Sequence, residues 1–591
     1  MKKIMTVIIC AATAASLTGC SLLNAVRLTR SLKGLPDPRP ETEMYILTEP
    51  AKTGYADQDE YAYEEYEPEL GTSYLRAEAM SQANTAGSGC AYLPEENVTP
   101  EWNTEEYKYL EENRWLSPAA SPFSTFAADV DTASYANLRR MLLEGRTVPA
   151  DAVRIEEMIN YFNYDYPAPD GEDVFSVSTD IAPCPWNDQT QLLRIGLKAK
   201  ELPQTQRSVS NLIFLIDVSG SMDEYNKLPL VQRAFRLLVN ELGEDDRVSL
   251  VTYANGDHIV LEGVPGSEKT KICDAIEDLY PSGGTNGSAG LLRAYELAQE
   301  NFIEGGNNRV ILATDGDLNI GMTDEGSLTR LIEEKAKTGV FLSVLGFGEG
   351  NISDTNMEAL ADHGNGNYSY IDNIGEARKV LISEAGSTLF AVAKDVKLQV
   401  EFNPAKVKGY RLIGYENRMM AAESFSDDTK DGGEIGSGHT ITALYEIAPA
   451  GSSFEIDTVE SRYAGQTSAH TDAENDSAGT DEKNSSTGSD GKGSPKEDSF
   501  LGEWAILHIR YKQPDADESV LMDRIITDAC LADEMDDDFS WAAGVAQAGM
   551  LLKQSSYAGD TTLKDVRDRL KGLTGNDEFR EEFLYLLTRM E

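Results

Sequence analysis

The sequence is poor in basic residues, in histidine and cysteine, and in long apolar runs. Its 591 residues include 100 acidic and 52 basic side chains, a formal net charge of −48, with only five histidines and six cysteines. The acidic excess argues against a nucleic-acid partner, because phosphate binding needs clustered Lys and Arg. After the first twenty residues no stretch has the roughly 20 apolar residues that a membrane helix needs. The 41% of hydrophobic residues is sufficient for folded cores, and the length allows several domains.

The N-terminus has the pattern of an export signal. Lys2 and Lys3 precede an apolar run from Ile4 to Leu17, which is too short to span a bilayer. The run ends in Leu-Thr-Gly-Cys20, which resembles the lipobox of bacterial lipoproteins. That resemblance implies removal of residues 1–19, acylation of Cys20 and a lipid anchor on the extracytoplasmic face of a bacterial cell membrane. An ordinary secretory signal with a chance cysteine is the alternative.

The four cysteines after Cys20 are far apart in the sequence. They show no Cys-x-x-Cys spacing, which makes a zinc site improbable. An exported location would permit disulfides, but the sequence leaves their pairing open. The residues are Cys90, Cys184, Cys273 and Cys530.

Residues 20–117 have little hydrophobic periodicity and predict an acidic, disordered stalk. Tyr55–Glu69 contains seven acidic residues, no basic residue and four tyrosines. Low hydrophobicity and repulsion between like charges favour an extended chain. The alternative is a tyrosine-rich acidic binding segment.

Residues 207–390 alternate between strand-like and helix-like patterns, which predicts a doubly wound α/β domain. The continuously apolar run Leu212–Ile216 indicates a sheet that is covered on both faces. The short gap between Val248–Tyr253 and His258–Leu261 suggests one antiparallel hairpin at an edge. The further predicted strands are Val310–Ala313, Val340–Leu345 and Tyr368–Ile371; the helices are Leu228–Leu242, Lys269–Leu279, Ala289–Phe302 and Leu328–Lys337.

The α/β domain has a flank on each side, at residues 118–206 and 391–591. The first flank is expected to form helices and then strands, and the second to be β-rich and to end in three helices. Because strands occur on both sides, we expect the α/β domain to be inserted into a β-sandwich that the flanks build together. Residues 464–498 contain no Val, Ile, Leu, Met or aromatic residue, which predicts a disordered insertion.

Three segments predict a cation site. Asp217-Val-Ser219-Gly-Ser221 directly follows one apolar strand, and Thr314-Asp315 follows another; the third segment is the glycine-rich loop Ser282-Gly-Gly-Thr285. In a doubly wound sheet, ligands bind beyond the carboxyl ends of the strands. Two carboxylates and three hydroxyls suit Mg²⁺ or Mn²⁺, and Ca²⁺ less well. The alternative is that these residues only cap helices.

This combination resembles the metal-ion-dependent adhesion site of von Willebrand factor type A (vWA) domains. The resemblance implies hydroxyl ligands from Ser219, Ser221 and Thr285 and carboxylates from Asp217 and Asp315, some of them acting through water. An acidic side chain of a protein partner would complete the coordination. In related domains ligand binding is linked to a shift of the last helix, which would lie here near residues 376–387.

Both flanks resemble those of bacterial vWA lipoproteins. Phe126–Tyr135 and Arg154–Tyr161 carry the resemblance before the domain, and Tyr410–Asn417 and Ala542–Leu552 carry it after the domain. The whole resemblance covers about residue 124 to the end, apart from the insertion.

Other motifs favour structural roles. Asp131 is expected to cap the helix that follows it. The aromatic cluster of Tyr161, Phe162, Tyr164 and Tyr166 is expected to lie in a core.

These observations predict a membrane-tethered protein that is not an enzyme and that binds an unknown protein through a divalent cation. The alternative is an envelope scaffold in which the cation only stabilises the loops. A hydrolase that uses the cation to activate water ranks third, because no general base of suitable spacing is found.

Overall fold

The computed structural model covers the chain, and its residues Thr99–Glu591 form one compact unit. The structure describes residues 104–128, 131–203, 207–316, 325–430, 432–456, 500, 502–514, 516 and 518–590, with side chains omitted at 325–327. The predicted signal, Cys20, most of the stalk and the insertion at 464–498 lie outside these residues. Among the described helices, none is long and apolar enough to cross a membrane.

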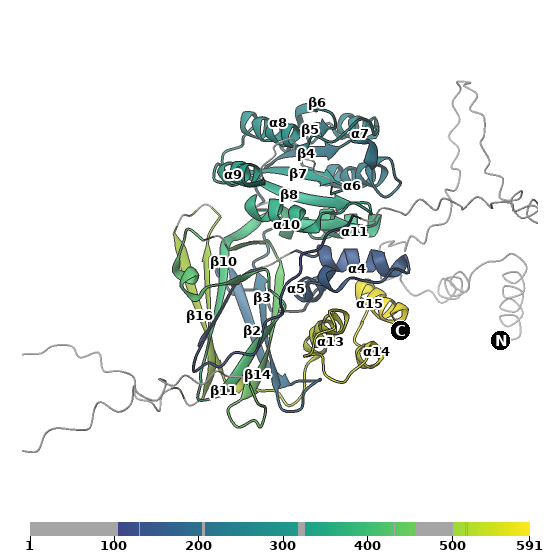
Figure 1. Cartoon of the computed structure of the whole chain (residues 1–591). Coiled ribbons are helices and arrows are strands. Elements are labelled where there is room, and N and C mark those ends of the chain that lie inside the picture. Colours follow the sequence, from purple (N-terminus) through teal and green to yellow (C-terminus); the bar gives the residue numbers. More distant parts are fainter. Residues whose placement is uncertain are drawn as a thin grey trace, which may run out of the picture. The chain divides into compact units, whose positions relative to one another are not determined.

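A six-stranded sheet in the order β6-β5-β4-β7-β8-β9 forms the α/β domain (Figure 1). All its strand pairs are parallel except β5–β6, an antiparallel pair at one edge, as the short gap predicts. The strands are β4 (Ser210–Asp217), β5 (Arg247–Tyr253), β6 (Asp257–Pro265), β7 (Asn307–Thr314), β8 (Val340–Phe347) and β9 (Tyr368–Ile371).

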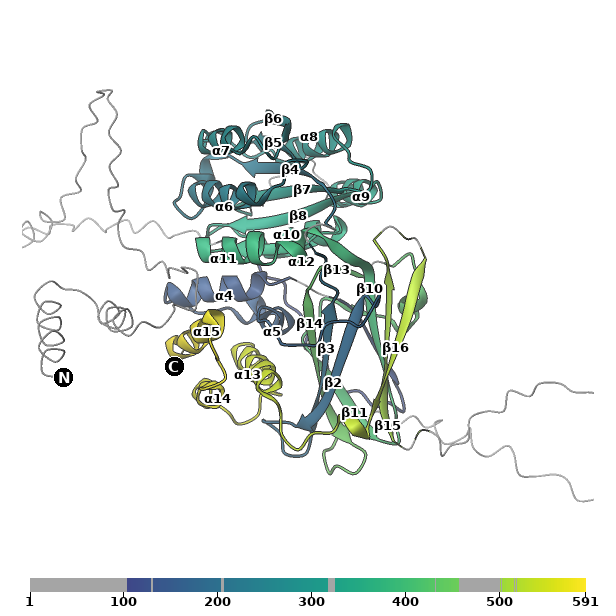
Figure 2. The same cartoon turned by 180° about the vertical axis from the view of Figure 1, so that it is seen from behind.

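Helices cover both faces of this sheet, because alternate side chains of each strand enter different cores. On β4, Leu212, Phe214 and Ile216 pack in one core, and Ile213 and Leu215 pack in the other. Figure 2 shows α6, α7 and α11 on one side of the sheet. The helices are α6 (Leu228–Glu241), α7 (Lys269–Glu277), α8 (Gly287–Glu300), α9 (Glu325–Ala336), α10 (Asp354–His363), α11 (Ile374–Arg378) and α12 (Ala385–Leu389).

The flanks form the predicted β-sandwich around a shared core. One sheet has the order β11-β14-β3-β2, and the other the order β12-β1-β10-β15-β16 with β13 on β10. The core combines side chains from before the α/β domain, such as Ile195, with others from after it, such as Leu398. The strands are β1 (Phe123–Ala127), β2 (Phe175–Pro183), β3 (Gln191–Ala199), β10 (Ala391–Phe402), β11 (Val407–Ile413), β12 (Met419–Met420), β13 (Gly433–Gly436), β14 (Thr440–Pro449), β15 (Glu503–Lys512) and β16 (Ser519–Thr527).

Five helices pack on one another, and α5 packs on β14 of the sandwich. Their core contains the predicted aromatic cluster, whose four rings are at most 7% exposed. Trp541 lies at its centre and is fully buried. The helices are α4 (Ala133–Leu143), α5 (Ile155–Asn160), α13 (Asp537–Leu552), α14 (Leu563–Leu570) and α15 (Glu578–Arg589).

A buried ion cluster joins these helices to the α/β domain. All five N–H groups of Arg139, on α4, donate hydrogen bonds. The acceptors come from the end of β9, α11, α5 and α15, and we call the five residues the Arg139 cluster. They are Arg139, Tyr161, Asp372, Glu376 and Glu582.

Two predictions need correction in the flank. Residues 104–117 do not belong to a free stalk: Thr104 and Glu106 donate backbone hydrogen bonds to Gly350 and Ile352, and Leu116 pairs with Tyr410. The sequence did not predict these contacts, because backbone hydrogen bonds leave no pattern of apolar side chains. Asp131 does not cap α4. Its carboxylate accepts hydrogen bonds from the Tyr368 backbone, in the α/β domain, and from Arg418, in the second flank.

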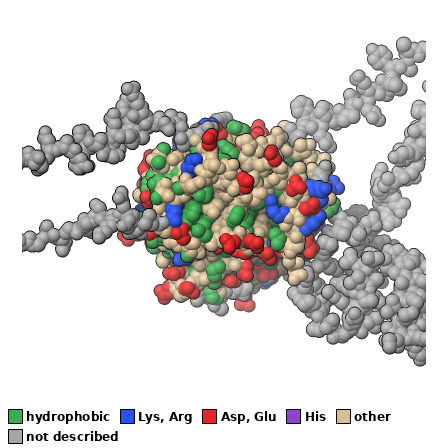
Figure 3. All heavy atoms as spheres, turned by 90° about the horizontal axis from the view of Figure 1, so that it is seen from below, with side chains coloured by type: hydrophobic (Ala, Val, Ile, Leu, Met, Phe, Trp, Pro, Cys, Tyr) green, Lys and Arg blue, Asp and Glu red, His purple; other side chains and the backbone are tan. Residues whose placement is uncertain are grey.

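Three cysteines among the described residues, Cys184, Cys273 and Cys530, are free thiols. The face in Figure 3 carries acidic side chains in groups among hydrophobic and polar ones. On that face the basic side chains of the described residues lie in small separate groups. The predicted lack of a nucleic-acid partner stays a prediction.

Candidate metal site

The predicted ligands lie at the carboxyl ends of β4 and β7 and in the loop before α8. These central strands are parallel neighbours, so their ends meet at one edge of the sheet. Asp217 is the last residue of β4, and Asp315 directly follows β7. Both are fully buried. The sheet therefore places both carboxylates at the same edge.

The turn after β4 arranges the first three residues around one point. The Ser219 backbone N–H donates to Asp217 Oδ1 at 2.8 Å. The Ser219 and Ser221 hydroxyls are hydrogen-bonded at 3.0 Å. Ser219 is 1% exposed, whereas Ser221 lies at the surface. One side of the site is thus closed by protein, and the other is open to solvent.

The glycine-rich loop is fastened to this turn by backbone hydrogen bonds. The Gly220 N–H donates to Gly283 O at 3.0 Å, and the Ser282 N–H donates to Val218 O at 2.7 Å. Gly283 has φ +79°, and a Cβ there would lie 2.5 Å from Asn255 Nδ2, so the loop needs glycine at this position. The loop brings half-buried Thr285 to the same edge, although no contact joins its side chain directly to the other four residues.

The two carboxylates affect each other. Burial raises the pKa of Asp217 to about 6; hydrogen bonds from Ser219 oppose this rise, and the negative charge of Asp315 adds to it. Thr314 donates from its hydroxyl to Asp217 Oδ2 at 3.4 Å. Two buried acidic groups at one edge of the sheet favour the binding of a positive charge.

The donor set fits a hard divalent cation. Asp315 Oδ1 is buried and has no hydrogen-bond partner among the described residues. A buried carboxylate oxygen without a partner is costly, and a bound cation would remove that cost. Carboxylate and hydroxyl oxygens are ligands that Mg²⁺ and Mn²⁺ prefer. The described residues contain no group of three or more His, Cys, Asp or Glu side chains that could hold a metal, so this site depends on its hydroxyls.

Lys227 is the residue that the sequence analysis missed. Its Nζ lies 3.3 Å from Asp315 Oδ2, and its side chain is 5% exposed. It directly precedes α6, where a positive charge faces the unfavourable end of the helix dipole. The sequence gives no signal for this pair, because Asp315 lies 88 residues further along the chain.

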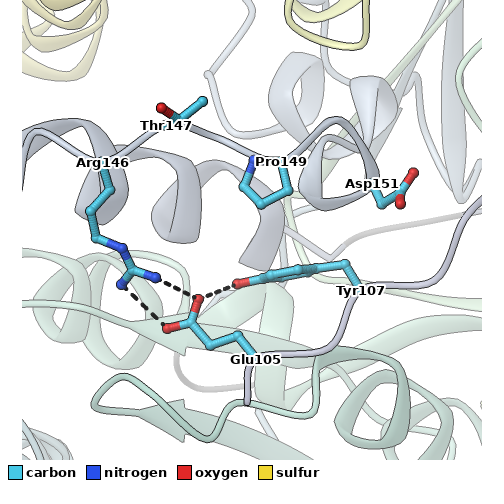
Figure 4. A pocket seen from close by; sticks show the side chains of 6 residues that line it. All are labelled: Glu105, Tyr107, Arg146, Thr147, Pro149 and Asp151. Atoms are coloured by element: carbon cyan, nitrogen blue, oxygen red, sulfur yellow. Dashed lines mark hydrogen bonds and ion pairs between the residues drawn. The ribbon is translucent and has the colours of Figure 1, made fainter. Parts of the chain in front are cut away.

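A pocket of about 530 Å³ lies elsewhere (Figure 4). Arg146 and Glu105 in its lining form an ion pair at 3.4 Å, and Tyr107 donates to Glu105 at 3.1 Å. None of the five predicted ligands lines it. Two of the three charged groups in its lining, Glu105 and Arg146, are paired with each other, and Asp151 lies apart from them (Figure 4).

Sequence comparisons give the family. The YfbK protein of Escherichia coli (strain K12) is 40% identical over 493 residues, which cover 82% of this chain and 80% of that protein. The chain belongs to the YfbK family of vWA proteins. Family models described as "von Willebrand factor", "von Willebrand factor type A domain" and "Uncharacterized protein YfbK, C-terminal" match residues 101–194, 211–381 and 387–591. The expected relation to bacterial vWA proteins with flanking domains is confirmed.

Two further similarities of this YfbK-family chain are more distant. Inter-alpha-trypsin inhibitor heavy chain H2 of Mus musculus is 32% identical over 146 residues, 23% of this chain and 15% of that protein. Among solved structures, a von Willebrand factor type A protein from Catenulispora acidiphila has 14% identity and a TM-score of 0.39, covering 72% of this chain and 91% of that one.

Proposed function

We propose that this vWA protein binds a divalent cation, Mg²⁺ or Mn²⁺, through Asp217, Ser219, Ser221, Thr285 and Asp315. Through that cation it binds a carboxylate of a protein partner. The observation that carries the proposal is the buried Asp315 Oδ1, which has no hydrogen-bond partner among the described residues, next to a second buried carboxylate. Vacant coordination positions on the solvent side, next to Ser221, would accept the partner's oxygen.

The proposed role is binding without catalysis. The cation would supply a fixed positive charge that a partner carboxylate recognises, while the protein holds its oxygen ligands in place. Membership of the vWA family supports the proposal, because these domains commonly bind metals and proteins.

Calorimetric titration of the full chain with Mg²⁺ and with Mn²⁺ tests the cation site. We expect saturable binding to one site, and no binding to a folded Asp217→Ala variant. Asp278→Asn is the matched control, because Asp278 is an exposed carboxylate at the end of α7 in the same domain. Absence of binding to both the natural chain and the control would refute the proposal.

The second candidate is a scaffold in which the cation only stabilises loops. Gly316, next to Asp315, packs against Asn351–Ser353. The segment from Thr104 to Glu106 is hydrogen-bonded to the same stretch. This packing of loops around the site favours the scaffold. Chelation separates the two functions. Loss of carboxylate binding with the fold retained supports the binding function, whereas melting of the loops with carboxylate binding unchanged supports the scaffold.

We also propose that the protein is anchored by lipid at Cys20 on the outer face of a bacterial cell membrane. The support is the sequence Leu17-Thr-Gly-Cys20 after an apolar run. Mass spectrometry of the N-terminal peptide and cell fractionation test this. Cys20→Ser should release the protein from the membrane fraction, and the control Cys273→Ser should not. A membrane fraction unchanged by Cys20→Ser would contradict the anchor.

A further inference from the structure

Lys227 is fixed beside the candidate metal site by its surroundings. Its Nζ lies 3.3 Å from Asp315 Oδ2, and the other acidic side chain within 4 Å of it among the described residues, Glu224 at 3.8 Å, is exposed. The aliphatic part of the side chain packs against Gly348. A Cβ at Gly348 would lie 2.4 Å from Lys227 Cε, so this close approach requires glycine. The ammonium group is therefore held against Asp315 and does not extend into solvent.

Burial of this ammonium is unfavourable without its acidic partner. Removal of a charge from water costs free energy, which only a close opposite charge and hydrogen bonds offset. The N-terminal end of α6 adds repulsion, because the helix dipole is positive there. Placing Lys227 beside Asp315 therefore costs free energy that a surface lysine does not require.

The charges of the site change sign when a cation binds. Two buried carboxylates and one ammonium leave one net negative charge. A bound divalent cation would convert this to one net positive charge. Without Lys227, the cation and the two carboxylates would neutralise each other, and an anionic ligand would gain less from the site.

We propose that Lys227 is a built-in positive charge of the site, which weakens binding of the cation alone and favours a carboxylate ligand once the cation is bound. The inference rests on the proposed function and deepens it, since it names the residue that makes cation and carboxylate bind cooperatively. Such coupling is reciprocal: the factor by which carboxylate strengthens cation binding equals the factor by which cation strengthens carboxylate binding.

The test is calorimetric titration of the full chain with Mn²⁺, with sodium acetate as the carboxylate probe and sodium chloride at equal ionic strength as reference. For the natural chain we expect acetate to strengthen Mn²⁺ binding several-fold. Lys227→Met keeps the length of the apolar stem and removes the charge. It should bind Mn²⁺ alone about tenfold more tightly, because the repulsion between ammonium and cation is gone, and acetate should then have little effect.

Two variants control for other effects of the substitution. Lys227→Arg keeps the charge. It should bind Mn²⁺ alone as weakly as the natural chain does, and acetate should strengthen that binding. Lys271→Met removes an exposed lysine on α7 and should match the natural chain in both. Circular dichroism and the melting temperature check the fold. Mn²⁺ should raise the melting temperature of Lys227→Met more than that of the natural chain, because the variant leaves Asp315 without its counter-charge.

The outcomes distinguish this inference from the proposed function. If the natural chain binds Mn²⁺ and Lys227→Met binds it equally or less tightly, the role of Lys227 is refuted while the cation site stands. A Lys227→Met variant that stays unfolded in saturating Mn²⁺ also refutes it. If neither the natural chain nor any variant binds Mn²⁺, both the proposed function and the inference are wrong.

Discussion

The protein buries carboxylates in two places, at the metal-site edge and in the Arg139 cluster. The two places differ in how many of the carboxylate oxygens have partners in the protein. In the cluster, Arg139 donates all five of its N–H groups, and Asp372 accepts with both of its oxygens. Glu376 Oε1 has no hydrogen-bond partner in the described part of the chain, but Oε2 of the same side chain accepts from both Arg139 and Tyr161. At the metal-site edge, Asp315 has an ammonium neighbour at 3.3 Å, and its Oδ1 has no hydrogen-bond partner among the residues that the structure describes.

The difference indicates what each place is for. A guanidinium with every donor used has no capacity for a further ligand, so the cluster holds helices α4, α5 and α15 against α11. The metal-site edge has spare acceptors and opens to solvent at Ser221. Buried charged groups whose polar atoms nearly all have partners in the protein indicate a structural contact. Buried charged groups with polar atoms that lack such partners indicate a binding site.

The largest effect is expected from Arg139→Met. The change leaves the carboxylates of Asp372 and Glu376 buried without their cation, which should lower the free energy of unfolding by about 3–5 kcal/mol. Denaturant unfolding measures this. The matched control is Arg293→Met, which removes a more exposed arginine paired with Glu296 on α8 and should leave stability unchanged. Equal stability of both variants would show that the cluster is not a structural contact.

Mn²⁺ should stabilise the chain through the metal-site edge. At a concentration one hundred times the dissociation constant, a ligand that binds only the folded state adds about 2.7 kcal/mol. Thermal unfolding with Mn²⁺ and with chelator measures the difference, which Asp217→Asn should abolish. The control Asp274→Asn, an exposed position on α7, should keep it. Equal Mn²⁺ stabilisation in Asp217→Asn and the control would place the metal elsewhere.

Thr285→Val tests the contribution of one hydroxyl. Valine has nearly the same shape, so the fold and melting temperature without metal should not change, whereas Mn²⁺ affinity should fall about tenfold, or about 1.4 kcal/mol. Bound carboxylate should be lost with the metal. Thr270→Val, on the exposed face of α7, is the control. Unchanged Mn²⁺ affinity in Thr285→Val would remove this residue from the ligand set.

The smallest effect concerns Glu105, whose partners are Gly350 of the α/β domain and Arg140 and Arg146 of the first flank. Burial raises the pKa of Glu105, but hydrogen bonds from Gly350 and the positive charges of Arg140 and Arg146 outweigh this and hold it below its usual value of 4.5. A lowered folded pKa gives stabilisation that is present above the unfolded value and lost as the pH falls through the folded value. Hydrogen exchange at the Glu106 N–H, which donates to Ile352 O, should show reduced protection below pH 4.5.

Glu105→Gln is the variant that isolates this carboxylate. It should reduce protection of the Glu106 N–H at pH 7 and remove most of the change on acidification. Exchange within β4, in the same domain, serves as the internal reference. The same pH dependence in the variant and the natural chain would assign the effect to another group.

The sequence predicted the sheet, and it predicted that the candidate ligands follow its strands, because both depend on short, local patterns. An apolar strand such as Leu212–Ile216, followed by Asp217 and two serines, can be recognised from neighbouring residues alone. Helix α10 (Asp354–His363) was missed, since its few apolar residues, Met357 and Ala359–Ala361, are too short a run to establish a helical period. The Arg139 cluster was also missed: its partners Glu376 and Glu582 lie 237 and 443 residues away, and local spacing says nothing of such pairs.

Lys227 shows the same limit at the site itself. It stands in the turn before α6, where the sequence does not distinguish it from a surface lysine. Only the arrangement of the strands brings Asp315 to within 3.3 Å of it. Residues 104–107 have no apolar pattern, and their contacts with Gly350 and Ile352 are made by backbone groups that every residue carries.

The most direct test of the central claim is an anomalous difference map from crystals of the full chain soaked in Mn²⁺. The account predicts a peak at the carboxyl ends of β4 and β7, within ligand distance of Asp217, Asp315 and the hydroxyls of Ser219, Ser221 and Thr285, directly or through water. It predicts no peak in the Arg139 cluster. An empty edge in crystals that bind Mn²⁺ elsewhere, or a metal among the carboxylates of the cluster, would contradict it.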